Sequence, residues 1–232
     1  MNVVEAIRAN ADSYAERVAI RDGDVEFNYR TFYERVDSLS QGFMAQDVSK
    51  GDVIVAWMTN SYHAIECEIA CLQIGVIWVT LHSGSTWYEV QTVLDSTRPT
   101  VAVIHDDLWS EDAGESFAAS GTRCVHASKS PETKSPHTGN CGHFDYEQMI
   151  AEHAALRPDV PIEPNDPARL RYTSGTTGQA KAAILAHRVY SCSLQNLTNE
   201  VHDLSPDDRA LYAAPLTHAA GALVFPMLAA GG

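Results

Sequence analysis

The sequence predicts an α/β protein with a doubly wound, largely parallel sheet and helices on both of its faces. Three short apolar runs carry this prediction: VIVAWM (53–58), VIWVT (76–80) and VAVIH (101–105). Each run lacks the polar–apolar alternation of a half-exposed strand, and a segment of helical length separates it from the next. Apolar strands that alternate with helices are typical of a parallel sheet that is covered on both faces.

The first fifty residues predict a helix, a hairpin and a second helix. Apolar residues at helical spacing define the first helix: Val3, Val4, Ile7, Ala11 and Tyr14. Asp22-Gly23 then marks a tight turn between the runs VAIR and VEFNY, which indicates a hairpin. Thr31 and Glu34 have capping-box spacing, so we expect a helix to begin there. Its apolar face consists of Tyr33, Val36, Leu39 and Phe43.

Between the second apolar run and residue 168, the sequence predicts two capped helices and two irregular segments. Thr86 with Glu89 opens one helix, and Asp145 caps another that runs through His153. Residues 128–142 are rich in Ser, Pro, Thr and Gly, which is typical of a surface loop. The proline-punctuated residues 157–167 form a connector. We therefore expect a first α/β subdomain over 1–168 and a second region over 169–232.

The second region begins with two predicted strands, ARLRYT (168–173) and AAILA (182–186), on either side of a glycine-containing segment. A helix over HRVYSCSLQNLTNEV (187–201) and a strand over RALYAA (209–214) follow. Residues 219–230 are mostly apolar and predict a buried helix. With Gly221 and Pro226 inside it, this stretch is too short and too interrupted to span a membrane, and no other window approaches that length.

The segment YTSGTTGQAK (172–181) has the composition of a loop that binds polyphosphate. Gly175 and Gly178 carry no Cβ and can adopt positive φ, so backbone N–H groups could approach anionic oxygens closely. Hydroxyl groups and one cation accompany them: Thr173, Ser174, Thr176, Thr177 and Lys181. This combination points to ATP.

The composition of this segment also allows two other interpretations. A Walker-type P-loop needs G-x-x-x-x-G-K-[ST]. Here Gln179 follows Gly178, and Ala182 stands where a magnesium-binding hydroxyl belongs, so that pattern fails. An ordinary Gly/Thr-rich turn is the second alternative, because a short motif alone is only a hypothesis.

Several segments, in order along the chain, resemble the adenylate-forming superfamily of acyl- and aryl-CoA ligases, luciferases and peptide-synthetase adenylation domains. They are AIRDGDVEFNY (19–29), SKGDVIVAWMTNS (49–61), IACLQIGVIWVTLHSGST (69–86), YTSGTTGQAK (172–181) and APLTHAAG (214–221). The chain departs from the family pattern at Thr80 and Ala180, where the family usually has Pro, and at Ala182, where it usually has Gly. Within this superfamily, the segments LHSGST (81–86) and PLTHAAGA (215–222) resemble acyl- or aryl-CoA ligases more than peptide-synthetase domains.

The resemblance implies a two-step ligation in which a fatty or aryl acid reacts with ATP to give an acyl-adenylate, from which CoA then displaces AMP. It implies that residues 173–178 and Lys181 bind the phosphates, that Mg²⁺ binds at Thr176, and that Lys181 and His218 are catalytic. Residues 169–232 would hold the phosphate-binding loop and the incomplete start of a second α/β subdomain. Since the superfamily continues beyond this point, we interpret the chain as an N-terminal fragment that is nearly inactive alone. A non-catalytic nucleotide-binding or interaction module and an amino-acid-activating adenylation domain are the alternatives.

Composition restricts the partners. A formal net charge of −14 argues against a nucleic-acid or anionic-membrane surface, so sites for ATP and CoA must be local positive regions. Five cysteines that are too widely spaced for a dense disulfide framework fit reduced thiols and a cytoplasmic location. A homo-oligomer is a further possibility that the sequence leaves open.

A zinc site is a further alternative, formed by Cys124, His126, His137, Cys141 and His143, although the paired spacing of a zinc finger is missing.

Overall fold

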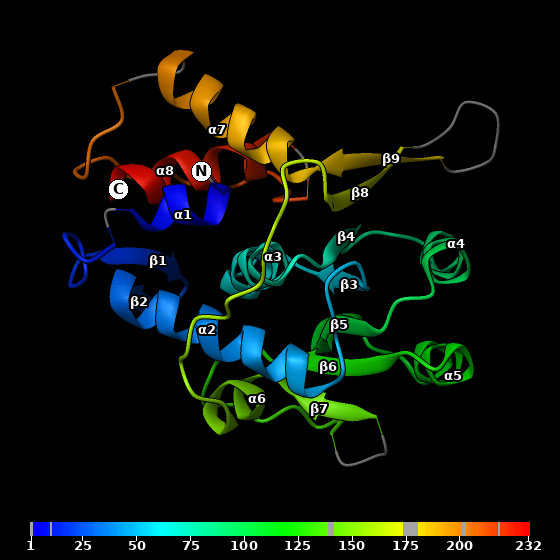
Figure 1. Ribbon diagram of the computed structural model, residues 1–232. Helices are drawn as coiled ribbons and strands as arrows, with labels where there is room; N and C mark the ends of the chain where they lie inside the picture. The colour runs from blue at the N-terminus through cyan, green and yellow to red at the C-terminus, as the bar shows by residue number, and fades with distance from the viewer. Residues whose placement is uncertain (1, 10, 139–141, 174–180, 201–202, 218) are drawn as a thin grey trace.

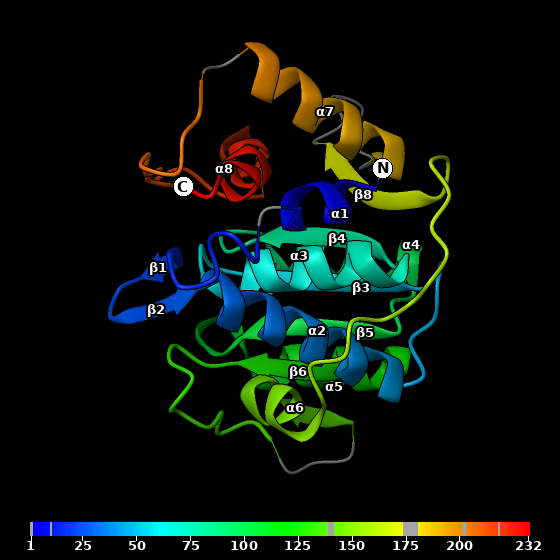
Figure 2. The ribbon, with the colours of Figure 1, turned by 60° about the vertical axis from the view of Figure 1, so that its left-hand side comes forward.

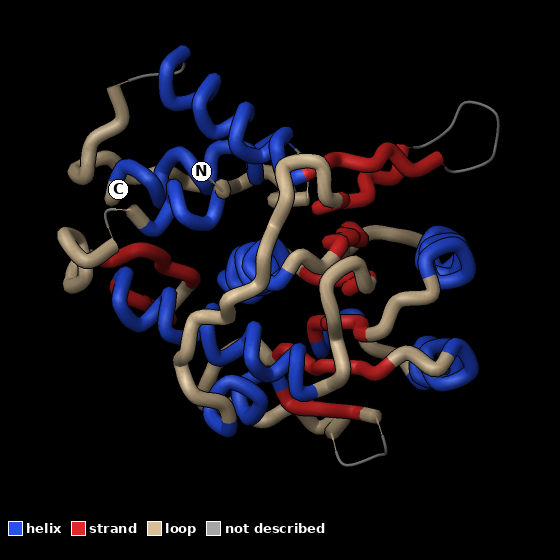
Figure 3. Tube along the Cα trace, viewed as in Figure 1, coloured by secondary structure: helices blue, strands red, loops and turns tan. Residues whose placement is uncertain are grey.

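The computed structural model describes residues 2–9, 11–138, 142–173, 181–200, 203–217 and 219–232, without the side chains of Thr173, Lys181 and Ala219 (Figure 3). The strands in these ranges are β1 Val18–Asp22, β2 Val25–Asn28, β3 Val53–Met58, β4 Ile77–His82, β5 Val101–His105, β6 Arg123–Ala127, β7 His143–Asp145, β8 Pro167–Thr173 and β9 Lys181–Ala186. The helices are α1 Val3–Arg8, α2 Tyr29–Ala45, α3 Tyr62–Ile74, α4 Trp87–Thr97, α5 Glu111–Ser120, α6 Tyr146–Glu152, α7 His187–Glu200 and α8 Val224–Ala230, with 3₁₀ turns η1 Asp106–Leu108 and η2 Ala219–Leu223.

A seven-stranded sheet of order β7-β6-β5-β3-β4-β8-β9 organises the molecule, and β1 with β2 forms a separate hairpin. Neighbouring strands are parallel from β7 through β8, and β9 is antiparallel to β8. Helices α2, α3 and α6 cover one face of the sheet, and α4 and α5 cover the other (Figure 1). The predicted doubly wound, largely parallel α/β fold is therefore confirmed.

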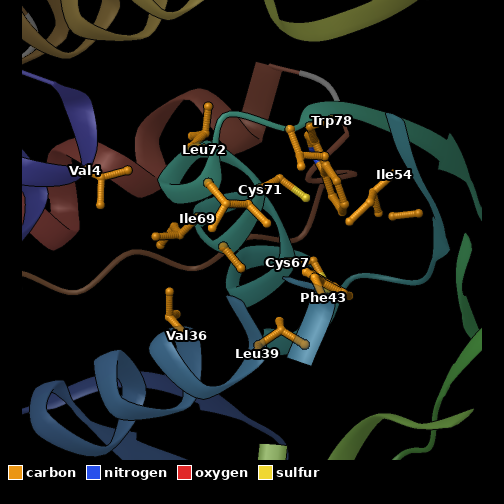
Figure 4. Close-up of a cluster of buried hydrophobic side chains, with 14 of the residues drawn as sticks. Val4, Val36, Leu39, Phe43, Ile54, Cys67, Ile69, Cys71, Leu72 and Trp78 are labelled. Carbon is orange, nitrogen blue, oxygen red and sulfur yellow. The ribbon is translucent and has the colours of Figure 1, made fainter. Parts of the chain in front are cut away.

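The main core lies where α2 and α3 meet the sheet (Figure 4). Val36, Leu39 and Phe43 of α2 are fully buried, as the sequence pattern predicted. Opposite them lie Cys67 and Cys71 of α3, which are equally buried and act as small apolar packing residues. Burying one large apolar side chain contributes about 1.5–3 kcal/mol, so this layer provides much of the favourable free energy of folding.

Helices α1, α7 and α8 lie together beyond the β4 side of the sheet (Figure 2). Val4 of α1 and Val224 and Phe225 of α8 belong to the same continuous core as α2 and α3. The hydroxyl of Tyr29 donates to the carbonyl of Gly232 at 3.1 Å. The end of the described chain is thereby tied to the start of α2.

Four local predictions were wrong or incomplete. Helix α1 ends at Arg8, and Ala11 and Tyr14 lie in turns after it. Helix α2 begins at Tyr29 rather than near Thr31, because the side chain of Asn28 accepts the N–H of Thr31 at 2.8 Å and caps the helix. Residues 209–214 form no strand. The short strands β6 and β7 were not predicted, since each has only a few apolar residues.

Other local predictions are confirmed. The hairpin turn contains Gly23 at φ 58°. Thr86 with Glu89 forms the predicted capping box of α4, and Asp145 caps α6. Strand β8 begins at the end of the predicted connector and joins the same sheet as β3 and β4, so the division of the chain near residue 168 stays a prediction.

Candidate active site at the carboxyl edge of the sheet

Strands β8 and β9 carry the two ends of the predicted phosphate-binding loop. Their antiparallel pairing places Thr173 opposite Lys181. Thr173 at the end of β8 and Lys181 at the start of β9 therefore lie at the carboxyl edge of the parallel sheet, which is the edge where open α/β sheets bind ligands. The predicted residues Ser174, Gly175, Thr176, Thr177 and Gly178 lie outside the described part of the chain, as does His218. Their roles stay predictions, together with those of the side chains of Thr173 and Lys181.

Strand β8, which leads into the predicted loop, has side-chain contacts on both faces of the sheet. On one face, the hydroxyl of Tyr172 lies 2.6 Å from that of Ser96 in α4. Leu170 and Tyr172 also pack against the apolar cluster between the sheet and helices α4 and α5. On the opposite face lie Arg169 and Arg171, because side chains alternate along a strand.

Arg169 is a buried cation that connects four elements of the structure. Its Nη1 donates to Glu68 of α3 at 3.1 Å, and its Nη2 donates to the hydroxyl of Thr80 in β4 and to the backbone carbonyl of Thr217, both at 3.1 Å. Tyr190 of α7 donates to the same oxygen of Glu68 at 2.8 Å. Burial acts to lower the pKa of Arg169, but Glu68 and Tyr190 more than offset it and raise the pKa, so the guanidinium stays charged.

A second polar contact holds the irregular segment before His218. The side-chain amide of Asn60, directly after β3, donates to the carbonyls of Tyr212 and Ala214 at 3.3 and 2.9 Å. Its carbonyl oxygen accepts the N–H of Leu216 at 3.0 Å. The Asn60 side chain thus satisfies backbone groups of Tyr212, Ala214 and Leu216 that a neighbouring strand would otherwise satisfy, so these groups need no β-pairing.

Two cavities adjoin these contacts. A cavity of about 20 Å³ lies at the ends of β3 and β4, and Asn60, Thr80 and Thr217 are among the residues that line it. A larger cavity of about 260 Å³ lies between β8, α7 and α8, and both Arg169 and Arg171 border it. Its other walls are largely apolar: Leu185, Val189, Leu194, Phe225 and Pro226. Glu68 also lines this cavity and pairs with Arg169, so Arg171 supplies the excess positive charge beside the apolar walls.

Sequence reasoning did not identify Glu68, Arg169 or Asn60 as site residues. A signal was present, because Glu68 lies in the apolar run of α3 and Arg169 alternates with apolar residues in β8. A charged residue at a position that the pattern buries requires a partner. Which partner it has depends on the packing of β4 against β8, which the sequence does not give.

The predicted Cys/His group is only partly brought together. His126 Nε2 lies 2.9 Å from His143 Nδ1, and the ring of Trp109 packs against both imidazoles and against His137. Burial lowers the pKa of His126 to about 3, so this imidazole is neutral. Cys141 lies outside the described residues. Among those described, no group of three or more His, Cys, Asp or Glu residues is arranged to hold a metal ion.

Within the described residues, none of the helices has both the length and the apolar composition needed to cross a membrane.

Comparison with known proteins gives one family match and many relatives. The model of the family described as AMP-binding enzyme matches residues 7–232. The 3-[(3aS,4S,7aS)-7a-methyl-1,5-dioxo-octahydro-1H-inden-4-yl]propanoyl:CoA ligase of Rhodococcus jostii (strain RHA1) is 26% identical over 93% of this chain and 43% of its own length. The feruloyl-CoA synthase of an Amycolatopsis species is 32% identical over 92% of this chain and 39% of its own. The chain thus spans about two fifths of the length of these curated relatives.

A solved structure gives the same fold. The crystal structure of the anthranilate CoA ligase AuaEII in complex with anthranoyl-AMP superposes with a TM-score of 0.86. It is 20% identical and covers 100% of this chain, which in turn covers 44% of that structure. At this identity the likeness supports the arrangement of strands and helices described above.

Proposed function

The chain belongs to the AMP-binding enzyme family, and from this premise we propose that it supplies the phosphate-binding part of an AMP-forming acid–CoA ligase. The observation that carries the proposal is the β8–β9 pairing, which places Thr173 and Lys181, the residues on either side of SGTTGQA, opposite each other at the carboxyl edge of the sheet. In the proposed reaction a carboxylate attacks the α-phosphate of ATP and releases pyrophosphate. The CoA thiol then attacks the acyl carbon and releases AMP.

The loop serves the first of these two steps. Hydroxyls of Ser174 and Thr176 and the backbone N–H groups beside Gly175 and Gly178 would hold the β- and γ-phosphates, and Lys181 would offset the charge of the leaving pyrophosphate. Hydroxyl and phosphate oxygens are hard ligands of the kind that Mg²⁺ prefers, so Thr176 would help to hold this ion, which neutralises phosphate charge. His218 would line the acyl pocket beside the reacting carboxylate.

The substrate class is a fatty or aryl acid. The apolar cavity between β8, α7 and α8 supports an acid with an apolar body, because its walls offer few hydrogen-bonding groups apart from the arginines and their partners. The free cysteines Cys67, Cys71, Cys124 and Cys192 support a reducing, cytoplasmic location. A homo-oligomer also stays a proposal, and sedimentation velocity at several concentrations would test it.

Carboxylate-dependent exchange of labelled pyrophosphate into ATP tests the function. We would measure it for this chain and for the longest polypeptide of its gene that contains it, with pooled fatty, aryl and amino acids. We expect exchange with fatty or aryl acids from the longest polypeptide, and little or none from the 232-residue chain alone. Exchange with amino acids alone would instead identify an amino-acid-activating domain. Nucleotide binding without exchange in the longest polypeptide would identify a non-catalytic nucleotide-binding module.

A further inference from the structure

The Arg169 contacts join the two chain segments that carry the proposed catalytic residues. Arg169 lies on the strand that leads into the phosphate-binding loop, and its Nη2 donates at 3.1 Å to the carbonyl of Thr217, the neighbour of His218 in the chain. We propose that Arg169 is a positioning residue: Glu68 and Thr80 orient its guanidinium, which fixes residues 212–217 beside β8. The assignment of a catalytic role to this arrangement rests on the function proposed above.

The geometry of the contact favours positioning. A guanidinium is planar and presents its donors in a fixed fork, so two partners that hold it also define the direction of the remaining N–H groups. Glu68 accepts a hydrogen bond from Nη1, and the hydroxyl of Thr80 in β4 accepts one from Nη2. Glu68 is itself oriented by the Tyr190 hydroxyl at 2.8 Å. Thr80, which stands where the resembled family usually has Pro, supplies a hydroxyl that proline does not have.

The segment held by Arg169 depends on such contacts because it has no regular backbone pairing. Residues 209–215 are neither helix nor strand, and Asn60 holds them through the carbonyls of Tyr212 and Ala214. The turn that follows is tight: a Cβ added to Gly221 would collide with the carbonyl oxygen of Leu216. Leu216, the neighbour of Thr217, therefore lies close to both Gly221 and Asn60.

Stability alone does not account for the Arg169–Glu68 pair. The two side chains are only 8% and 17% exposed, and a buried ion pair loses hydration that its attraction often barely replaces. Apolar side chains of similar volume are frequently as stable in such places. What an apolar replacement cannot supply is the donor to the Thr217 carbonyl.

The test uses the double variant Arg169→Met/Glu68→Gln, which removes both charges while leaving an acceptor for Tyr190. The control is Arg8→Met/Asp37→Asn, which neutralises a similarly buried pair (14% and 8% exposed) that has no described hydrogen bond to residues 212–217. Hydrogen–deuterium exchange of the 232-residue chain reports the amides of 212–221. We expect their exchange to rise on the order of tenfold in the first variant, as for one lost hydrogen bond, and to stay unchanged in the control.

Unchanged exchange of 212–221 in a folded Arg169→Met/Glu68→Gln variant would overturn the proposal. If that variant does not fold, Thr80→Val decides instead, because it removes one orienting hydroxyl and keeps the side-chain shape. A rise in the exchange of 212–221 with β3 and β5 unaffected supports the proposal, and no rise overturns it.

Pyrophosphate exchange then tests the catalytic role separately. In a polypeptide that shows exchange, the double variant should lower the rate at saturating substrates at least about tenfold and leave the KM for ATP within about threefold, since the proposal displaces residues 212–217 and assigns the ATP phosphates to the other segment. An unaltered rate would refute the positioning role. If the parent protein shows no exchange, the proposed ligase function fails while the amide exchange still decides whether Arg169 fixes the segment.

Discussion

Removing the charge of Arg35 is expected to destabilise the protein strongly, because this one guanidinium neutralises two carboxylates between helices α2, α3 and α6. Its Nε and Nη2 donate to both oxygens of Glu66 at 2.6 and 3.1 Å. Its Nη1 and Nη2 donate to both oxygens of Glu147 at 2.7 and 2.8 Å. Glu66 is fully buried and Glu147 is 13% exposed. Arg35→Met keeps the apolar stem and leaves both carboxylates without this partner.

The size of the effect follows from this burial. Breaking a buried ion pair by removing one partner costs about 3–5 kcal/mol. In a chain of this length each 1 kcal/mol lowers Tm by about 2–4 °C, so Tm should fall by about 6–20 °C. Urea unfolding at pH 7, followed by circular dichroism, measures the free energy directly. Arg30→Met is the control, because Arg30 and Glu16 are 56% and 76% exposed and such a surface pair contributes below about 1 kcal/mol.

The pH dependence gives the prediction a second test. Burial raises the pKa of Glu66 even with Arg35 present, and it should rise further without the guanidinium. The folded variant then holds a proton that the unfolded chain releases near pH 4.5, so its stability should increase as the pH falls from 7 toward 5. In the parent protein burial raises the pKa of Glu147, but His63 and Arg35 more than offset it and lower that pKa to about 2. Without Arg35 the pKa of Glu147 should also rise, so Glu147 changes the stability deficit in the same direction as Glu66. A loss below 1 kcal/mol, or a deficit equal at pH 7 and pH 5, would refute the reasoning.

Three further predictions concern the loop, the irregular segment and the core. In a longer polypeptide that shows pyrophosphate exchange, Lys181→Ala should slow the exchange by roughly 10- to 1,000-fold, as for a lost charge-assisted contact, and an unchanged rate would remove Lys181 from the mechanism. Asn60→Ala removes three hydrogen bonds and should speed amide exchange of residue 216 at least about tenfold; equal protection would show that other contacts hold the segment. Leu72→Ala in the fully buried core should cost about 2–5 kcal/mol in urea unfolding, whereas Leu156→Ala, at 67% exposure, should change stability by less than about 0.5 kcal/mol, and similar losses would contradict the described burial.

Most of the fold was predictable from local pattern. The runs over β3 and β5 are apolar because both faces of those strands are covered. Helix α4 starts at its capping box because the side chains of Thr86 and Glu89 each accept the backbone N–H of the other residue. The predicted start of α2 failed for a related reason. Both Asn28 and Thr31 are residue types that cap helices, and which of them caps α2 depends on where the preceding strand β2 ends.

The candidate site divides in the same way. The order of motifs along the chain sufficed to indicate the family, which the match over residues 7–232 confirms. That residues 172–181 bind phosphate stays a prediction from their glycines and hydroxyl donors, which are local properties. Residues 209–214 looked like a strand from their composition, yet no strand forms there, and the amide of Asn60 binds their carbonyls instead. Strand formation needs a partner, which local sequence does not specify.

The sequence by itself determined the α/β class, the main strands and helices, and the place of the loop between β8 and β9. These properties depend on periodicity, capping and backbone freedom within a few neighbouring residues. Only the tertiary structure decided that Arg169 meets Glu68, Thr80 and Thr217, which lie 48 to 101 positions away along the chain. Such contacts arise because parallel strands bring distant segments side by side, and a buried charge can be interpreted only once its neighbours in space are known.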